Sequence, residues 1–390
     1  MPPRKKTKEA VEEQNINPIK TTASVEKEAA ELEAIYGELE DLAEDDDHFF
    51  PSGSFVIDTV LSNGKGVPLG KFISINSEAG TGKSSMCLHI ARNCCAKGFR
   101  CLYIDTETGL NKSQLDSFGM LPFVENRTFI PKNAIRTYRE LDDLLSKVQQ
   151  DESLKFIFID SLTDLLPDQF LETNISDVNQ PALEAVAQSR ILKKYKYSMC
   201  HSGKTIFFVL QNRTKIAMSY GQQTTVQAAG GKAVAYHMDI ALELKKIEEL
   251  TRTIKGHAKP VPYGSRCLLQ SNKNRYAMPK IPMEIQIIYG KGVSNSGAIA
   301  NALILEGIAR QPTKVKYAID YQGEEHVLMS RAKFEEFIKE HLSYYKEIVE
   351  GLGGIRLVRE EDDVKPNSDN IENTIEELSN PSDESAEETK

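Results

Sequence analysis

The chain has 390 residues, 40% of them hydrophobic and 27% charged, with a formal net charge of −9 at pH 7. This composition is that of an ordinary globular protein, and it excludes a transmembrane span because no run approaches about 18 apolar residues. No apolar stretch follows the basic N-terminus as in a signal peptide, so we expect a cytoplasmic protein with no membrane partner.

The N-terminal part divides into an arm and a helix. Residues 1–23 are polar, with a basic cluster and no periodicity, which indicates a flexible basic arm. In residues 24–48, apolar side chains recur every three or four positions among glutamates, which predicts an acidic helix with a narrow apolar stripe. Two alternatives stay open for this stripe, packing on its own domain or docking on a neighbouring protomer, and we predict the second.

Residues 49–295 alternate short β-rich runs with helical stretches. The runs are residues 72–76, 101–105, 156–160, 205–210 and 240–244. This alternation predicts an α/β fold with a mostly parallel sheet flanked by helices. Ligands of such sheets bind at the C-terminal ends of the strands. The six cysteines show no CxxC spacing, which favours reduced, partly buried thiols over a zinc site or disulfides.

The C-terminal part contains a small domain and a tail. Helical signals at 298–309 and 330–341 surround a short polar strand pair, so residues 296–358 are predicted to form a small α+β domain. Residues 359–390 are expected to be disordered. Residues 360–390 hold twelve Asp or Glu and two Lys, so the rest of the chain is close to neutral. The overall acidity therefore does not exclude a nucleic-acid partner.

A glycine-rich segment joins the run 72–76 to a helical stretch. It comprises Ser77, Glu78, Ala79, Gly80, Thr81, Gly82, Lys83 and Ser84, and Ser85 follows in the helix. This is a Walker A loop in its required strand–loop–helix context, with Ser77 at the usual first glycine. The glycines let backbone N–H groups face the phosphates of ATP, which the helix N-terminus also attracts. Lys83 would neutralise the β and γ phosphates, and the Ser84 hydroxyl would bind Mg²⁺.

Two further strands end in carboxylates suited to the same chemistry. Asp160 ends the buried run 156–160 and is the Walker B candidate, a second ligand of the Mg²⁺ shell. Glu107 follows the run 101–105 and is placed to orient and deprotonate an attacking water. A buried strand ending in Asp is common, so Asp160 gains its meaning from the Walker A loop.

Several segments, in order and with nearly the right spacings, resemble the bacterial RecA family and its UvsX-like phage relatives. They are residues 101–111, 208–216, 230–233, 273–279 and 285–292. The resemblance covers roughly residues 50–345. It implies a RecA-type P-loop ATPase core with mostly parallel sheet, an N-terminal helix and a small C-terminal α+β domain.

The same resemblance implies catalytic roles for individual residues. Glu107 matches the family's catalytic base, and Gln211 matches the glutamine that senses the γ-phosphate and leads into the second DNA-binding loop. Lys273 and Arg275 match two basic residues that reach into the neighbouring subunit's ATP, so hydrolysis would depend on filament assembly. Gln114 stands where the family has an adenine-stacking tyrosine, which leaves Tyr289 as the candidate contact for the base.

Two long connections flank the expected DNA face, at about residues 168–181 and 212–230. The first is acidic, whereas the second holds basic residues that would contact phosphates without reading sequence. The residues that match DNA-binding positions are Lys193, Arg213, Lys215, Gly230, Gly231 and Lys232. The acidic tail is either a solubilising end or, as we hypothesise, a competitor of DNA for this basic face.

The resemblance implies an ATP- and Mg²⁺-dependent DNA recombinase that forms homo-oligomeric filaments on single-stranded DNA and exchanges strands with double-stranded DNA in recombination and repair. Single-stranded-DNA-binding and loader proteins are further candidate partners. We expect it on DNA in the cytoplasm, that of the host if the protein is phage-encoded. The alternatives are a hexameric helicase motor, or a mediator that binds ATP without using it. The presence of Lys83 and Glu107 argues against the mediator.

Overall fold

The computed structural model describes residues 48–168, 180–215, 225–228, 231–254, 256 and 259–351. The predicted basic arm, the predicted acidic helix up to Asp47 and the acidic tail lie outside these residues. Within the described ranges, each helix is too short or too polar to span a membrane.

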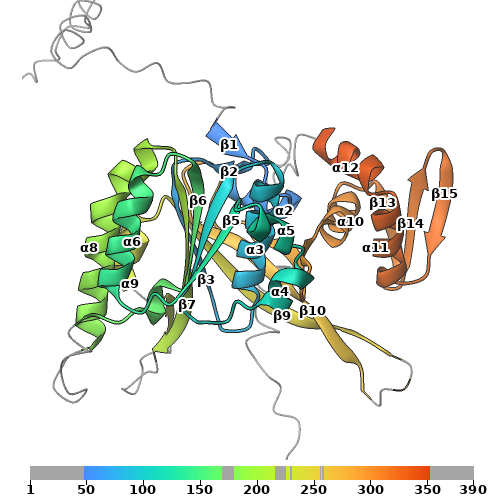
Figure 1. The fold of residues 1–390 in the computed structure, drawn as a ribbon. Coiled ribbons are helices and arrows are strands. Elements are labelled where there is room, and N and C mark those ends of the chain that lie inside the picture. The colour runs from blue at the N-terminus through green and yellow to red at the C-terminus, as the bar shows by residue number, and fades with distance from the viewer. Residues whose placement is uncertain are drawn as a thin grey trace, which may run out of the picture. The chain divides into compact units, whose positions relative to one another are not determined.

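Ten described strands form one sheet, which contains all five predicted strands (Figure 1). Its order is β12-β11-β10-β9-β3-β7-β6-β4-β5, with β8 paired to β7. The strands from β9 to β5 run parallel, whereas β10, β11 and β12 continue the sheet in antiparallel fashion. Their bounds are β3 (Phe72–Ser77), β4 (Arg100–Asp105), β5 (Phe129–Asn133), β6 (Leu154–Asp160), β7 (Thr205–Lys215), β8 (Thr225–Ala228), β9 (Ile240–Arg252), β10 (Val261–Lys273), β11 (Met283–Ile288) and β12 (Gly292–Ser294). A separate pair, β1 (Phe49–Phe50) and β2 (Val67–Pro68), precedes them.

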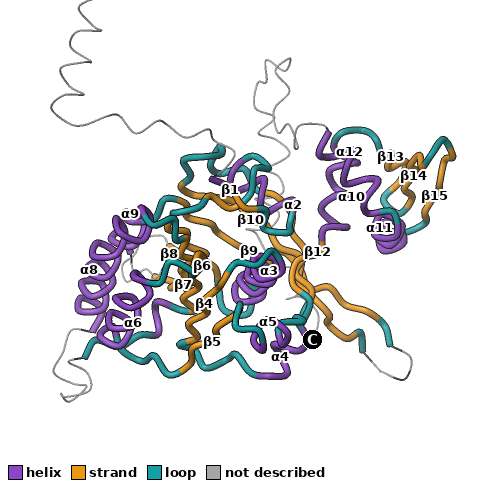
Figure 2. Tube along the Cα trace, turned by 45° about the horizontal axis from the view of Figure 1, so that its top comes forward, coloured by secondary structure: helices purple, strands orange, loops and turns teal. Residues whose placement is uncertain are grey.

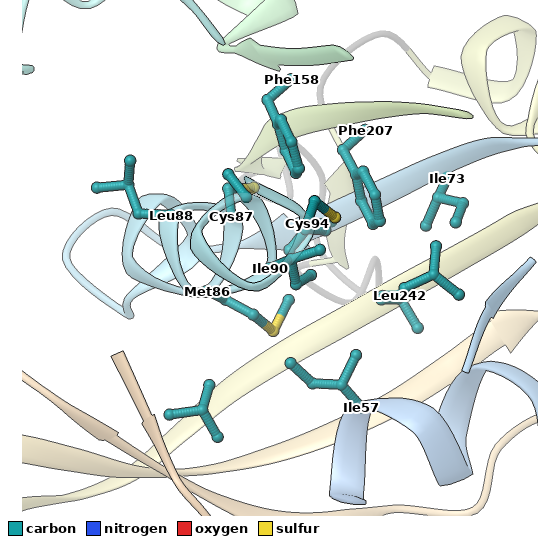
Figure 3. Packing of buried hydrophobic residues seen from close by; sticks show 14 of the residues in the cluster. Ile57, Ile73, Met86, Cys87, Leu88, Ile90, Cys94, Phe158, Phe207 and Leu242 are labelled. Atoms are coloured by element: carbon teal, nitrogen blue, oxygen red, sulfur yellow. The ribbon is translucent and has the colours of Figure 1, made fainter. Parts of the chain in front are cut away.

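Helices cover both faces of this sheet (Figures 1 and 2). One face carries α2 (Phe55–Ser62), α3 (Lys83–Ala96), α4 (Lys112–Ser117) and α5 (Leu121–Glu125), and the other carries α6 (Tyr138–Gln150), α8 (Gln180–His201) and α9 (Gly231–His237). The parallel strands are buried on both sides because their side chains alternate between two apolar clusters. Phe158 and Phe207 stack with ring centroids 5.0 Å apart next to α3 (Figure 3), whereas their neighbours Ile157 and Phe208 belong to the opposite cluster.

The C-terminal part has its own apolar cluster. It consists of α10 (Asn295–Leu305), β13 (Ala309–Thr313), β14 (Lys316–Tyr321), β15 (Glu324–Leu328), α11 (Arg331–Glu340) and α12 (Leu342–Gly351). Tyr317 of β14 stacks on Phe334 of α11 with centroids 5.0 Å apart. Both predicted helices are present, and the predicted strand pair is a three-stranded antiparallel sheet.

The second long connection is not the continuous loop that the sequence predicted. Strand β7 continues past Gln211 to Lys215 and pairs antiparallel with β8, so that Arg213 lies opposite Gln227. The β-branched Thr225 and Val226 favour a strand, but the polar residues around them mask this preference in the sequence. Strand β9 likewise extends to Arg252 and not Leu244, because its outer half pairs with β10 while exposing polar side chains.

His89 gives the fold a predictable pH dependence. It lies 5% exposed on α3, and its Nδ1 accepts a hydrogen bond from the Val293 backbone N–H at 3.3 Å. Burial, assisted by Arg92, lowers the pKa of His89 from 6.5 to about 4. As the pH falls below about 6.5, the unfolded chain takes up a proton that the folded protein refuses, so stability present above that pH is lost toward pH 4.

We expect this single group to remove about 3 kcal/mol from the free energy of unfolding between pH 7 and pH 4. The variant His89→Asn keeps an acceptor for Val293 but does not titrate. Urea unfolding of both proteins across this range should show a shallower pH dependence for the variant, and parallel curves would contradict the prediction.

Candidate nucleotide site

The phosphate loop has the backbone that its glycines were predicted to provide. Gly80 and Gly82 adopt φ of 71° and 112°, the left-handed region in which side chains are strained. A Cβ on Gly82 would lie 2.8 Å from the Cδ1 of Ile287. Ser77 replaces the usual first glycine without strain, because it lies in β3 with no positive φ and pairs in register with Gln211.

The ammonium group of Lys83 is held inside this loop. Its Nζ donates to the backbone oxygens of Ser77 at 3.2 Å and Glu78 at 2.8 Å, and to the Ser77 hydroxyl at 3.1 Å. Burial lowers the pKa of Lys83, while Asp160 and Glu107 oppose this effect. All three partners are neutral oxygens, so a phosphate oxygen that displaces them would gain a charge-assisted hydrogen bond.

The loop forms one wall of a cavity of about 230 Å³. The cavity is lined by Ala79, Gly80, Gly82, Lys83, Ser84, Ser85, Glu107, Gln211 and Tyr289. The structure therefore brings together residues predicted from four separate segments, including Tyr289, which is 42% exposed. Glycine backbone, a lysine, a hydroxyl and an exposed aromatic ring fit the triphosphate, metal and base of a nucleotide.

Glu107 and Gln211 meet inside this cavity. The Gln211 Nε2 donates to the Glu107 Oε1 at 2.8 Å. Partial burial raises the pKa of Glu107, whereas the hydrogen bond from Gln211 lowers it and the carboxylates of Asp160 and Asp164 raise it. Sequence reasoning missed Asp164, which lies in a 3₁₀ turn after β6 and approaches Glu107 only in the folded chain.

Asp160 lies deeper, 5% exposed at the end of β6. Its Oδ2 accepts a hydrogen bond from the Tyr103 hydroxyl at 2.6 Å, and its Oδ1 has no hydrogen-bond partner among the described residues. Burial raises the pKa of Asp160, and the hydroxyls of Ser84 and Tyr103 oppose the rise. A free buried carboxylate oxygen beside a serine hydroxyl fits the oxygen ligands that Mg²⁺ prefers. Tyr103 was not predicted, because in the sequence it reads as one more apolar residue of β4.

Lys273 and Arg275 lie away from the nucleotide cavity of their own chain. Lys273 pairs with Ala241, which in turn pairs with Ser74 before the middle of β3, whereas the phosphate loop follows the opposite end of that strand. The Lys273 Nζ donates to the backbone oxygens of Ala235 at 3.2 Å and Tyr236 at 3.0 Å. The Arg275 guanidinium lies 3.7 Å from Asp239. Neither side chain therefore lines the nucleotide cavity of its own chain.

The structure describes only some of the predicted DNA-binding residues. Lys193 is exposed on α8 and lines a second cavity, of about 570 Å³, with Lys71, Lys196 and His237. Arg213 and Lys215 belong to the β7–β8 hairpin, and Gly231 and Lys232 begin α9. The side chains of Arg213, Lys215 and Lys232 lie outside the described part of the chain, as do Gly230 and most of the first long connection.

Known proteins resemble this chain over most of its length. Residues 20–294 match the family described as the RecA N-terminal domain. Protein RecA of Bifidobacterium longum is 27% identical over 337 residues, which cover 84% of this chain and 79% of that protein. Protein RecA of Frankia alni is 30% identical over 261 residues, 67% of this chain and 71% of that protein. Protein RecA of Rubrobacter xylanophilus is 28% identical over 309 residues, 78% and 84% respectively. The chain therefore belongs to the RecA family of recombinases.

Proposed function

We propose that this protein is a DNA-dependent ATPase that polymerises on single-stranded DNA and pairs that strand with a homologous duplex. The observation that carries the proposal is the 2.8 Å hydrogen bond from Gln211 to Glu107. Gln211 belongs to the same strand, β7, that continues into the β7–β8 hairpin. One side chain thus connects the hydrolytic carboxylate with the segment expected to contact DNA.

Each residue of the nucleotide site has a separate role in the proposed reaction. Lys83 and the backbone N–H groups of the glycine loop hold the phosphates, and Ser84 and Asp160 hold the magnesium ion. When bound, Mg²⁺ offsets the negative charge of the phosphates. Glu107 orients the attacking water and accepts its proton. The Gln211 amide exchanges its bond to Glu107 for one to a phosphate oxygen, which shifts β7 and its hairpin.

A neighbouring protomer completes the site. Lys273 and Arg275 are too far from their own phosphate loop to act there, and they supply positive charge to the next protomer's nucleotide. Preorganised cations at a transferring phosphoryl group stabilise its transition state. ATP hydrolysis is therefore coupled to filament assembly. Within the protomer that binds the nucleotide, Tyr289 contacts the base.

The DNA contacts are expected to be independent of sequence. Basic groups of Lys193, Arg213, Lys215 and Lys232 bind phosphates, and the glycines 230 and 231 allow the backbone to approach them. Binding of this kind weakens steeply with salt. Recognition of the homologous duplex is left to base pairing, and single-stranded-DNA-binding and loader proteins are candidate partners.

The test compares ATP turnover with and without single-stranded DNA, followed by strand exchange between circular single strands and a homologous linear duplex. We expect DNA to raise turnover about tenfold or more, because assembly brings in the trans-acting cations. Exchange should require homology, and a forked duplex without homology should stay intact. Full turnover by isolated protomers without a polynucleotide would refute the proposal, and unwinding of the fork would favour a helicase motor.

A further inference from the structure

A buried tyrosine lies beside the carboxylate proposed to hold the metal. Tyr103 of β4 is 1% exposed and belongs to the apolar cluster under α3. Its ring stacks on Phe158 with centroids 5.9 Å apart and an interplanar angle of 21°. Its hydroxyl donates to the Asp160 Oδ2 at 2.6 Å. Asp160 is the last residue of the neighbouring strand, β6.

The hydroxyl group is what requires an explanation. A phenylalanine would fill the same apolar place, whereas a buried hydroxyl without an acceptor costs about 1–3 kcal/mol. A phenol carries its proton at neutral pH, so the Tyr103 hydroxyl is a hydrogen-bond donor there. Its acceptor is a charged oxygen, and hydrogen bonds to charged groups are stronger than those between neutral groups.

The two oxygens of Asp160 are thereby made different. Oδ2 is occupied by the phenol, while Oδ1 has no hydrogen-bond partner among the residues that the structure describes. A hydrogen bond to Oδ2 restrains rotation of the carboxylate about the Cβ–Cγ bond of Asp160. The direction in which Oδ1 points is thereby held constant. The adjacent carboxylate, Asp105, pairs in register with Asp160, but its Oδ2 accepts the Leu110 backbone N–H at 2.7 Å and so helps to hold the following turn.

We propose that Tyr103 is a positioning residue for the metal, which acts by holding Asp160 Oδ2 so that Oδ1 faces the magnesium ion. The inference rests on the proposed function, because it takes Asp160 as a ligand of the metal shell. Tyr103 is not among the residues that line the nucleotide cavity, so it would act through Asp160. Partners of this kind orient a ligand, and their loss lowers metal affinity by roughly 10- to 100-fold.

The test is the variant Tyr103→Phe in the full chain, which removes one oxygen and keeps the ring. Affinity for a fluorescent ADP is measured in EDTA and over a Mg²⁺ titration. We expect the Mg²⁺ concentration for half-maximal effect to rise roughly tenfold, with unchanged affinity in EDTA. Because both affinities come from one preparation, a smaller folded fraction would not imitate this result.

Two further variants make the outcome decisive. Tyr138→Phe is the matched control, since Tyr138 is another buried tyrosine, whose hydroxyl donates to the Leu162 backbone oxygen at 3.2 Å and accepts from Gln188 at 2.9 Å. It should leave the Mg²⁺ requirement unchanged. Asp160→Asn should raise it. If Asp160→Asn raises the Mg²⁺ requirement and Tyr103→Phe behaves like the control, the positioning role of Tyr103 is wrong. If Asp160→Asn leaves the Mg²⁺ requirement unchanged, the assignment of Asp160 as a metal ligand is itself wrong.

Discussion

Replacement of Glu107 by Gln should lower the ATP turnover number by roughly 10²- to 10⁴-fold while ATP still binds. Glu107 is the carboxylate among the residues that line the nucleotide cavity, whereas Asp160 lies deeper and is proposed to hold the metal. A glutamine keeps the size of the side chain and can still accept the hydrogen bond from Gln211 through its amide oxygen. Single-turnover hydrolysis and fluorescent-nucleotide binding separate the two effects.

The same variant should form filaments that persist, because the nucleotide that stabilises assembly is no longer consumed. Electron microscopy on single-stranded DNA with ATP, after times at which wild-type filaments have dissociated, gives this second readout. Glu125→Gln is the control, since Glu125 is an exposed glutamate of α5 and is absent from the cavity lining. Normal turnover in the Glu107 variant would rule out its assignment as the base.

Two inactive variants should restore activity to each other when mixed. Lys83→Ala removes the phosphate ligand of a protomer, and Arg275→Ala removes a cation that this protomer lends to its neighbour. In a filament grown from equal amounts, about a quarter of the interfaces would pair an intact phosphate loop with an intact Arg275, since head-to-tail contacts join opposite surfaces. The DNA-dependent rate should therefore reach about a quarter of the wild-type rate.

The control mixes Lys83→Ala with Glu107→Gln. Both residues line the cavity of one protomer, so no interface in this mixture has a complete site and the rate should stay near that of either variant alone. If neither mixture recovers DNA-dependent ATP hydrolysis, Arg275 does not act in trans. Recovery in both would contradict the assignment of Lys83 and Glu107 to one site.

The sequence predicted those parts of the site that depend on neighbours along the chain. The phosphate loop requires glycines, a lysine and a serine at fixed spacings, and the structure has the predicted strand before it and helix after it. The approach of Glu107 to Gln211 depends instead on the strand order, which places β6 between β4 and β7. The family resemblance assigned both residues to the same ATP but did not predict their contact, because local patterns of hydrophobicity carry no information about strand order.

Tyr103 and the β7–β8 hairpin mark the limits of local patterns. The role of Tyr103 depends on the register that sets Asp105 opposite Asp160, and this register is visible only in the assembled sheet. The paired segments of the hairpin are only four residues long and mostly polar, so their alternation is too short to predict a strand.

Helix α9 connects the β7–β8 hairpin with Lys273. The helix begins at Gly231, shortly after the hairpin, and the backbone oxygens of Ala235 and Tyr236 near its other end accept hydrogen bonds from Lys273. Seven residues make a rigid rod about 10 Å long. A displacement of residue 231 along the helix axis would therefore also move the two backbone oxygens that hold the Lys273 ammonium group. This helix thus links the proposed DNA-binding hairpin mechanically to the cation that we propose acts on a neighbouring nucleotide.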